Sequence, residues 1–460
     1  MVWIILRREL LDALLGLRFQ LVLLLTVLLM GVSGLLFPLK YQSLVDEYNQ
    51  SQRRNLQGLE RPAGRLVDLV SHFQILPMQP ARLAFIAGGS EDQLPNAIEI
   101  AIREIRNPTS TGERNEFLTD LEDVDWTWLV QVLLSFAAIV LTFDALSGEK
   151  QNGTLCQTMA NQVPRGAVLV GKYLAALIVV LIPLAVGLLV GLLMLMLSGK
   201  VGLVPGDAAR VALFALIAAF YLSAVILLSL FVSARTSQPG TSLVVLLVIW
   251  TGLVAATPAV GGALLNSPFF SLRTTEEVRL QIEAVGKEVE AKHGLKRHWI
   301  ANADDPATRK VIQVQREMAF AAKKVRDQYM RDKIGAVAAV RQILSISPGE
   351  AFVHACEGIA GTGLVRVEHF LGQVEEYRQT FEAFFQAQDM RDPDSPHLFY
   401  HPDYMSSKPV DVAQIPKFQE RKTDWRQGLV SAAVPLTILI LYNGLFFLGA
   451  YIAFLRYDIR

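Results

Sequence analysis

The chain has 460 residues, of which 52% are hydrophobic and only 19% are charged, whereas an average soluble domain carries about 25% charged residues. Because the missing charge is concentrated in several long apolar runs, the composition excludes a purely soluble enzyme, and the high apolar content excludes a disordered chain. The 43 basic and 43 acidic residues cancel, so the overall charge gives no support for nucleic-acid binding.

Residues 2–17 have the pattern of a short amphipathic helix. Arg8, Glu9 and Asp12 fall on one side and several leucines on the other, while Arg7 falls on the apolar side and would have to reach toward water. Such a helix is expected to lie flat in the cytoplasmic membrane interface. The alternative is that it only extends the first membrane span.

Six later segments are apolar over the length that a helix needs to cross a bilayer, which is about 20 residues. In chain order they are residues 19–39, 126–146, 168–197, 211–232, 241–264 and 429–455. The sequence therefore predicts a mainly α-helical, polytopic membrane protein with six transmembrane helices. Two large insertions separate the spans, and both are expected to be mostly helical.

The lysines and arginines of the short loops predict the orientation, because such residues are enriched on the cytoplasmic side. With the N-terminus inside, nine of them lie on that side: Arg7, Arg8, Arg18, Lys150, Arg165, Lys172, Arg235, Arg456 and Arg460. An even number of spans also places the C-terminus inside. We expect a multi-pass protein of the plasma (inner) membrane with both termini in the cytoplasm.

These spans divide the chain into five parts. The interfacial helix and span one occupy residues 1–39, and the first extracytoplasmic region occupies 40–125. Spans two to five occupy residues 126–264, with a cytoplasmic coupling loop at 147–167. The second extracytoplasmic helical domain occupies residues 265–427, and span six with a short cytoplasmic tail occupies 428–460.

The second insertion contains three apolar stripes with helical spacing. They are Val278, Ile282, Val285 and Val289; Val311, Val314, Met318, Ala321 and Val325; and Val367, Phe370, Val374, Tyr377, Phe381 and Phe384. The first two are separated by a turn-rich stretch with an Asp cap, which predicts a helical hairpin. We interpret the stripes as the core of the insertion, and the alternative is a partner-binding groove or coiled-coil seam. Residues 349–364 are apolar but too short to span, and are expected to pack at the outer interface.

The coupling loop has the pattern of a short helix lying across the membrane surface. Gly153 and Thr154 supply a turn and an N-cap, Leu155 and Met159 an apolar side, and Pro164 a stop signal. A helix of this kind is suited to dock into a socket on another protein.

This loop resembles the first cytoplasmic loop of ABC-2-type transporter permeases. The matching residues are Glu149, Gly153, Thr154, Leu155, Pro164, Arg165, Gly171 and Lys172. Residues 343–364 and 397–404 further resemble a subgroup of these permeases with a large extracytoplasmic insertion between spans five and six.

The resemblance implies that the loop docks on a separate cytoplasmic ATPase. The residues expected to carry this coupling are Glu149, Gly153, Thr154, Leu155, Met159, Pro164 and Arg165. The chain itself has no GxxxxGK[ST] phosphate loop, so no enzyme activity is expected of it, no cofactor is assigned to it, and ATP with its magnesium would be held by the partner.

By the same resemblance the chain is expected to be an exporter permease that works as a dimer, with an identical or a sister permease, in contact with membrane lipid and two ATPase subunits. One alternative is ATP-driven mechanical transmission to an extracytoplasmic partner without substrate flux. Another is an ATP-independent membrane receptor or scaffold.

Some polar residues lie within the predicted spans, where they are candidates for lining a translocation path. Gln131 and Asn443 are candidates for lining an interior path, with interhelical hydrogen bonding as the alternative. Asp144 is expected to meet water or Lys150 near the cytoplasmic end.

No other chemical site is predicted. His397 and His401 are four residues apart, but the prolines around them argue against a helix and the glutamate of HExxH is absent. Cys156 and Cys356 are predicted on opposite sides of the membrane, so no disulfide is expected. We therefore assign no catalytic residue and no metal ligand.

Overall fold

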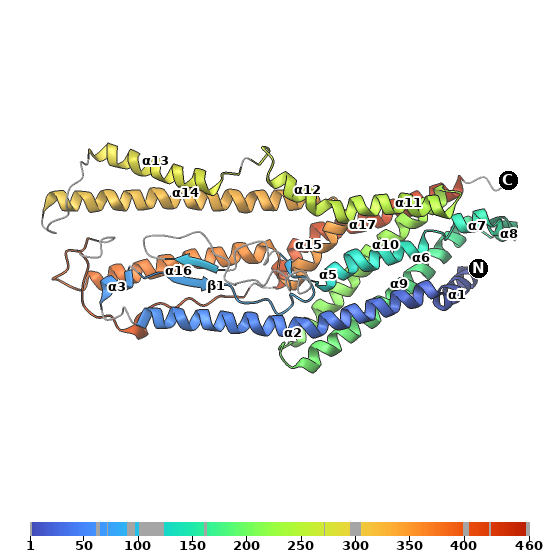
Figure 1. Cartoon of the computed structure of the whole chain (residues 1–460), viewed down its shortest axis with the longest axis horizontal. Coiled ribbons are helices and arrows are strands. Elements are labelled where there is room, and N and C mark those ends of the chain that lie inside the picture. Colours follow the sequence, from blue (N-terminus) through green and yellow to red (C-terminus); the bar gives the residue numbers. More distant parts are fainter. Residues whose placement is uncertain are drawn as a thin grey trace.

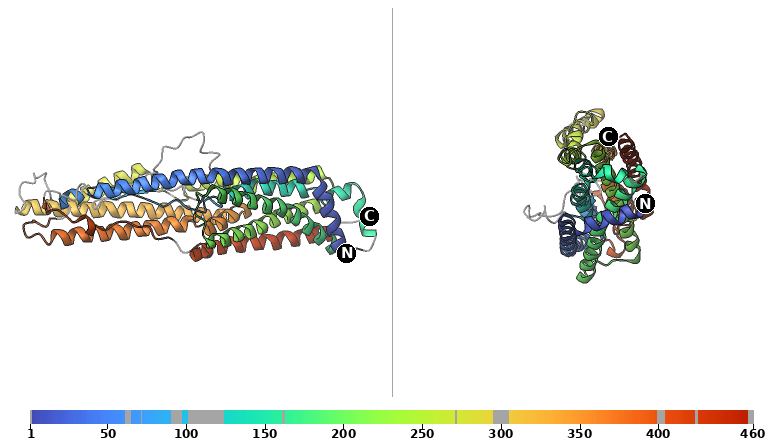
Figure 2. Two further views of the ribbon diagram at one scale, coloured as in Figure 1. Left: turned by 90° about the horizontal axis from the view of Figure 1, so that it is seen from below. Right: turned by 90° about the vertical axis from the view of Figure 1, so that its right-hand side faces the viewer.

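The protein is described by a computed structural model over residues 2–60, 65–70, 72–89, 97–100, 124–160, 163–270, 272–294, 305–398, 404–422 and 425–456. It is elongated, with a bundle of helices at the end where both termini lie and a helical extension at the other (Figure 1). The left view of Figure 2 shows the same long shape from below, and the right view, along the long axis, shows how narrow it is. The architecture is mainly helical, as predicted.

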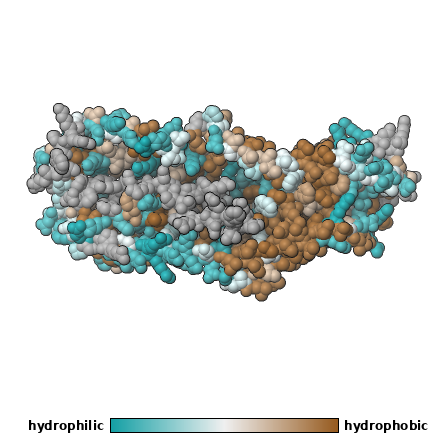
Figure 3. Space-filling model, viewed as in Figure 1, coloured by the Kyte–Doolittle hydropathy of each residue, from teal (hydrophilic) through white to brown (hydrophobic). Residues whose placement is uncertain are grey.

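Among the residues that the structure describes, six helical segments are long and apolar enough to cross a membrane, which confirms the predicted number of spans. They are α2 (Leu17–Glu60); α5, η3, α6 and α7 (Trp126–Trp128, Leu129–Leu134, Ser135–Thr142, Ser147–Gln151); α9 (Arg165–Ser198); α10 (Pro205–Arg235); α11, η4 and α12 (Pro239–Trp250, Thr251–Ala255, Ala256–Leu265); and α17 (Trp425–Leu455). Their apolar side chains form a continuous hydrophobic surface over the bundle, next to the more polar extension (Figure 3).

Helix α2 does not stop where the first span was predicted to end. It continues without a break past Pro38 to Glu60, a length of 44 residues. At 1.5 Å per residue this is about 66 Å, roughly twice the hydrocarbon thickness of a bilayer. One helix therefore runs from the terminal end of the bundle far into the extension (Figure 1).

The predicted helical hairpin is present as α13 (Thr275–His293) and α14 (Pro306–Leu344), which pack against each other. Thr274 and Glu277 form a capping box at the start of α13, and Asp305 caps α14 by accepting from the amide of Ala307. The connecting residues 295–304, including His298, lie outside the described part of the chain.

The third stripe is the core of the extension. Helix α16 (Leu364–Asp389) buries five of its six predicted positions, and Phe385 is buried where Phe384 was predicted, while Phe384 packs at the edge. The stripe faces α3 (Leu66–Val70) and a small antiparallel sheet that the sequence did not indicate, β1 (Gln74–Pro77) paired with β2 (Ala97–Ile100). Core packing, and not an open partner groove, accounts for this stripe.

The short apolar stretch near residue 350 forms α15 (Pro348–Ala360), which packs deep in the molecule and not only at its outer interface. Its residues Phe352 and Cys356 are fully buried in the main hydrophobic core, against α10 and α17. The approach to α17 is close because glycines meet there: a Cβ on Gly428 would lie 2.1 Å from the carbonyl oxygen of Gly358. Helix α15 thereby joins the extension to the bundle.

Candidate functional site

The coupling loop folds into two short helices at the terminal end of the bundle. Helix α7 (Ser147–Gln151) is followed by a turn at Gly153, whose φ of +71° favours glycine. Helix α8 (Thr154–Ala160) follows, and Pro164 precedes the start of α9 at Arg165. The short helix and its glycine turn therefore occur where the sequence pattern predicts them.

The apolar side of α8 faces the chain's own bundle. Leu155 is 0% exposed and belongs to the main core, and Met159 packs against the same core. The other side of α8 exposes Thr154, Cys156 and Ala160. Leu155 and Met159 therefore anchor the helix, and the surface left for a partner is the opposite, more polar side.

Glu149 lies in an ion cluster that joins three helices. Lys172 of α9 is 4% exposed, and its Nζ donates to Glu149 Oε1 at 2.8 Å and to Glu9 Oε1 at 2.7 Å. Glu9 belongs to α1 (Val2–Leu15), so the cluster links the N-terminal helix to the coupling loop. A buried cation bonded to two carboxylates is costly to break, because any partner left behind is an uncompensated charge.

Arg165 holds the end of the last span. Its guanidinium donates to the carbonyl oxygens of Phe454, at 3.3 Å, and Leu455. These are C-terminal carbonyls of α17, where a cation is favoured by the helix dipole. Arg165 therefore ties the start of α9 to the end of α17.

Lys150 fastens α7 to α10 in a similar way. Its Nζ donates to the carbonyl oxygens of Ser233 at 3.2 Å and Thr236 at 3.0 Å, at the C-terminal end of α10. The Ser233 hydroxyl also accepts from the backbone amides of Leu146 and Ser147. This contact could not be predicted from the sequence, where the signal for it is a basic residue next to a loop.

Asp144 pairs with Arg18 and not with Lys150 as expected. Arg18 Nη1 donates to Asp144 Oδ2 at 2.9 Å, which joins α2 to the end of the second span. Lys150 instead donates to the carbonyl oxygens at the end of α10.

The two polar residues suggested for a translocation path both bond to one turn of α10. The Asn443 amide donates to the Phe220 carbonyl at 2.9 Å and its oxygen accepts from Ser223 at 2.6 Å. The backbone carbonyl of Gln131, in the π-helical segment η3, accepts from Tyr221 at 3.1 Å. These two bonds of Asn443 join α17 to α10, and its amide also donates to the Leu439 carbonyl within α17 at 2.8 Å.

No group of three metal-binding side chains occurs among the residues that the structure describes. His397 Nδ1 donates to Asp389 Oδ2 at 2.9 Å, and His401 lies outside the described ranges.

Comparison with known families gives one match. A family model described as an ABC-2 family transporter protein matches residues 3–459, which is nearly the whole chain. A search of curated proteins gives no significant match.

Proposed function

This chain belongs to the ABC-2 family of transporter proteins, and we propose that it is the permease subunit of an ATP-driven exporter, working with a separate cytoplasmic ATPase. Members of the family are typically non-catalytic membrane subunits that work with an ATPase. The proposed subunit sits in the plasma (inner) membrane with both termini in the cytoplasm, as the loop charges indicate, and pairs with a second permease, identical or sister.

The observation that carries the proposal is the way the coupling loop is tied to the spans. Through Glu149, Lys150 and Arg165 the loop and its flanks bond to α1, α9, α10 and α17. A displacement of α8 by an ATPase would thus reach four helices, with α1 connected through Lys172 of α9. A conformational preference of the ATPase can shift the permease only through such differential contacts.

In this proposal the ATPase contacts the exposed side of α8 and the Gly153 turn. Leu155 and Met159 set the position of α8, and Glu149 and Arg165 transmit its movement to the neighbouring helices. ATP and magnesium are bound by the ATPase, and this chain supplies no cofactor site.

Mechanical transmission is a second candidate function, and helix α2 favours it. Because α2 is continuous from the bundle into the extension, a tilt at its cytoplasmic end would move the extension directly. The ATPase cycle could then act on an extracytoplasmic partner without substrate flux.

The test is a substitution on the exposed side of α8. Ala160→Arg adds a long cation without touching the core, and arginine is a good helix former. We expect unchanged expression and melting temperature, but loss of the ATPase that co-purifies with the tagged chain from native membranes. Ala291→Arg, at an exposed position of α13, is the matched control and should keep the ATPase. Equal recovery of ATPase from both variants would refute the docking surface.

Proteoliposomes that contain the purified complex distinguish export from mechanical transmission. ATP-dependent movement of a membrane-extract solute across the bilayer supports export. ATP-dependent distance changes between spin labels on α2 and α14, without any flux, support mechanical transmission.

A further inference from the structure

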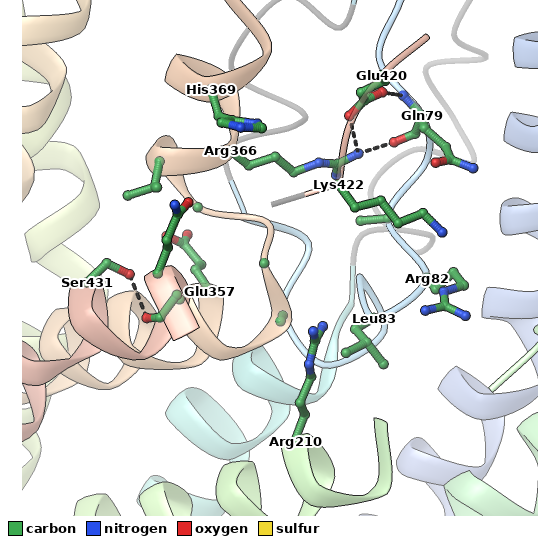
Figure 4. Close-up of a pocket in the computed structure, with 18 of the residues that line it drawn as sticks. Gln79, Arg82, Leu83, Arg210, Glu357, Arg366, His369, Glu420, Lys422 and Ser431 are labelled. Atoms are coloured by element: carbon green, nitrogen blue, oxygen red, sulfur yellow. Dashed lines mark hydrogen bonds and ion pairs between the residues drawn. The ribbon is translucent and has the colours of Figure 1, made fainter. Parts of the chain in front are cut away.

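A cavity of about 150 Å³ lies at the junction between the bundle and the extension. Figure 4 shows that its wall combines residues of both parts: Arg210 enters from α10 and Ser431 from α17, whereas Arg366 comes from α16 and Lys422 from the segment before α17. We call it the junction cavity. Its lining is unusual for this position because most of its charged side chains are cationic.

Five cationic side chains line the junction cavity, against two carboxylates. The cations are Arg82, Arg210, Arg366, Arg421 and Lys422, and the carboxylates are Glu357 and Glu420. Both carboxylates are already engaged, Glu357 by Arg341 of α14 and Glu420 by Arg366 at 3.8 Å. The lining therefore carries an excess of positive charge.

Three of the cations have acidic partners. Arg82 lies 3.8 Å from Asp207, Arg366 pairs with Glu420, and Arg421 pairs with Glu376. Arg366 also donates to the backbone carbonyl of Gln79, whose amide donates to Glu420 at 2.6 Å. These bonds fix one wall of the cavity.

Arg210 and Lys422 are different. Within the part of the chain that the structure describes, neither forms a hydrogen bond or an ion pair. They enter the cavity from opposite sides, Arg210 from the bundle and Lys422 from the extension (Figure 4). Lys422 is exposed and lies close enough to Glu420 to interact with it electrostatically, whereas Arg210 is half-buried. An anion between the two cations would be attracted by both.

Two helix N-termini add to the positive electrostatic potential of the junction cavity. The wall includes Gly363 and Arg366 at the start of α16, and Gln427 and Gly428 in the first turn of α17. Helix N-termini favour anions because their first amides point outward and the helix dipole is positive there.

Size and depth select the kind of anion. Sites for drug-sized ligands have volumes of roughly 300–1,000 Å³, so a cavity of about 150 Å³ holds a single compact group. Arg210 and Gly428 lie near the ends of two candidate spans, where the hydrophobic surface gives way to the polar extension. That depth corresponds to the lipid headgroups.

We propose that the junction cavity binds the phosphate group of a lipid headgroup, with Arg210 and Lys422 as its charged ligands. Arginine suits this role because its planar fork bonds two phosphate oxygens, while lysine acts as a point charge. A bound phosphate would join the bundle to the extension through one shared anion. This inference depends on the membrane spans and not on the ATPase.

The experiment uses the full chain purified in detergent and native mass spectrometry. Phosphatidylglycerol is compared with diacylglycerol of the same acyl chains. We expect the wild-type chain to retain phosphatidylglycerol selectively, and Arg210→Gln with Lys422→Gln to lower its affinity about tenfold or more, since one hydrogen bond to a charged group is worth at least that factor. Lys287→Gln with Lys310→Gln removes two exposed cations of the hairpin and should bind as the wild type does.

A second variant and a second ligand keep the test decisive. Arg210→Lys retains the charge but loses the fork, so it should bind more tightly than Arg210→Gln and less tightly than the wild type, which a merely misfolded variant would not do. Inorganic phosphate, followed by its effect on the melting temperature, separates the two sources of the anion. Equal retention of phosphatidylglycerol by the wild type and the double variant overturns the proposal. Binding of inorganic phosphate alone, with no lipid retained, overturns the lipid source.

Discussion

The ammonium group of Lys172 lies 2.8 Å from a carboxylate oxygen of Glu149, and this contact joins the coupling loop to the interior of the bundle. The same ammonium bonds Glu9 of α1 at 2.7 Å. Because Lys172 is 4% exposed and the two carboxylates are partly exposed, the cation at the centre of the cluster is buried and water reaches the carboxylates around it. Glu149 therefore acts on the rest of the chain through Lys172.

Replacing this central cation should uncouple the loop without unfolding the protein. Lys172→Met keeps the length of the side chain but leaves two carboxylates facing each other. We expect a loss of about 1–3 kcal/mol, below the 3–5 kcal/mol typical of a fully buried pair because water reaches the rim. Hydrogen exchange should accelerate in α1 and α7, and stimulation of the ATPase should fall.

Arg8→Met is the control, because Arg8 lies on α1 beside Glu9 but is exposed and forms only a long contact with Asp12 at 4.0 Å. It should change neither exchange nor stimulation. Unchanged exchange in α1 for Lys172→Met would mean that the cluster does not connect these helices.

The two cysteines provide a topology probe. Cys156 is exposed on α8, whereas Cys356 is fully buried in α15, so packing closes the Cys356 thiol to a labelling reagent. We expect a membrane-impermeant maleimide to label the folded chain in inverted vesicles, at Cys156 alone. Right-side-out cells should stay unlabelled.

Lys310→Cys, at an exposed position of the hairpin, supplies the matching outer site. It should be labelled in right-side-out cells even when Cys156 is replaced by serine. Labelling of Cys156 in sealed right-side-out cells would reverse the proposed orientation.

The spans could be predicted from the sequence because a bilayer imposes a simple requirement, about 20 apolar residues in one helix. The amphipathic helices of the extension were predictable for a similar reason, since a 3.6-residue period marks the buried side. Even there the last aromatic was misplaced by one position: Phe385 is buried and Phe384 is at the edge. A strict 3-4 spacing drifts away from the true helical period over the roughly five turns between Val367 and Phe384.

The partners of the charged residues could not be predicted in the same way. Arg165 bonds the carbonyls of a helix 289 residues further along the chain, and Lys172 bonds Glu9 across 163 residues. Such pairs depend on which helices are neighbours, and periodicity within one segment carries no information about that. The end of α2 could not be predicted from hydropathy. An apolar run shows which part of a helix lies in lipid, and it does not show where the helix ends.

The contact between α14 and α16 should depend on pH through Glu375. Burial alone would raise the pKa of this carboxyl, but hydrogen bonds from Arg378, Lys323 and Gln379 lower its pKa from 4.5 to about 2. The folded state thus favours the ionised form, and the stabilisation is present above about pH 4.5 and is lost as the pH falls toward 2. We expect a loss of about 1 kcal/mol, reduced by screening because the group is partly exposed.

Thermal unfolding between pH 2.5 and 6 measures this effect. Glu375→Gln should remove the acid-dependent part, while Glu368→Gln, at an exposed position of the same helix, should leave it intact. Identical pH profiles for Glu375→Gln and the wild type would contradict the assignment.

A charge placed in the contact between α13 and α14 should destabilise the hairpin. Val314 of α14 is 2% exposed, so Val314→Asp buries a carboxylate without a partner and should cost about 2–5 kcal/mol. We expect rapid proteolysis of the extension with normal membrane insertion. Gln315→Asp adds the same charge one residue away on the exposed side and should resist protease as the wild type does. Equal resistance of both variants would mean that Val314 is not in the seam.

The close approach of α15 to α17 leaves no room for a methyl group at Gly428. Its Cβ would lie 2.1 Å from the Gly358 carbonyl oxygen, which is backbone and cannot swing aside. Gly428→Ala should therefore push α15 outward at a cost of about 3 kcal/mol, the upper end of the usual range for overpacking. Because Cys356 lies on α15, its maleimide labelling in a Cys156→Ser background should become faster as the helix loosens. Gly444→Ala places a methyl group on the same helix where nothing lies within 4 Å, so it should leave Cys356 protected. If Gly428→Ala protects Cys356 as fully as the control does, the two helices are not held together by this glycine contact.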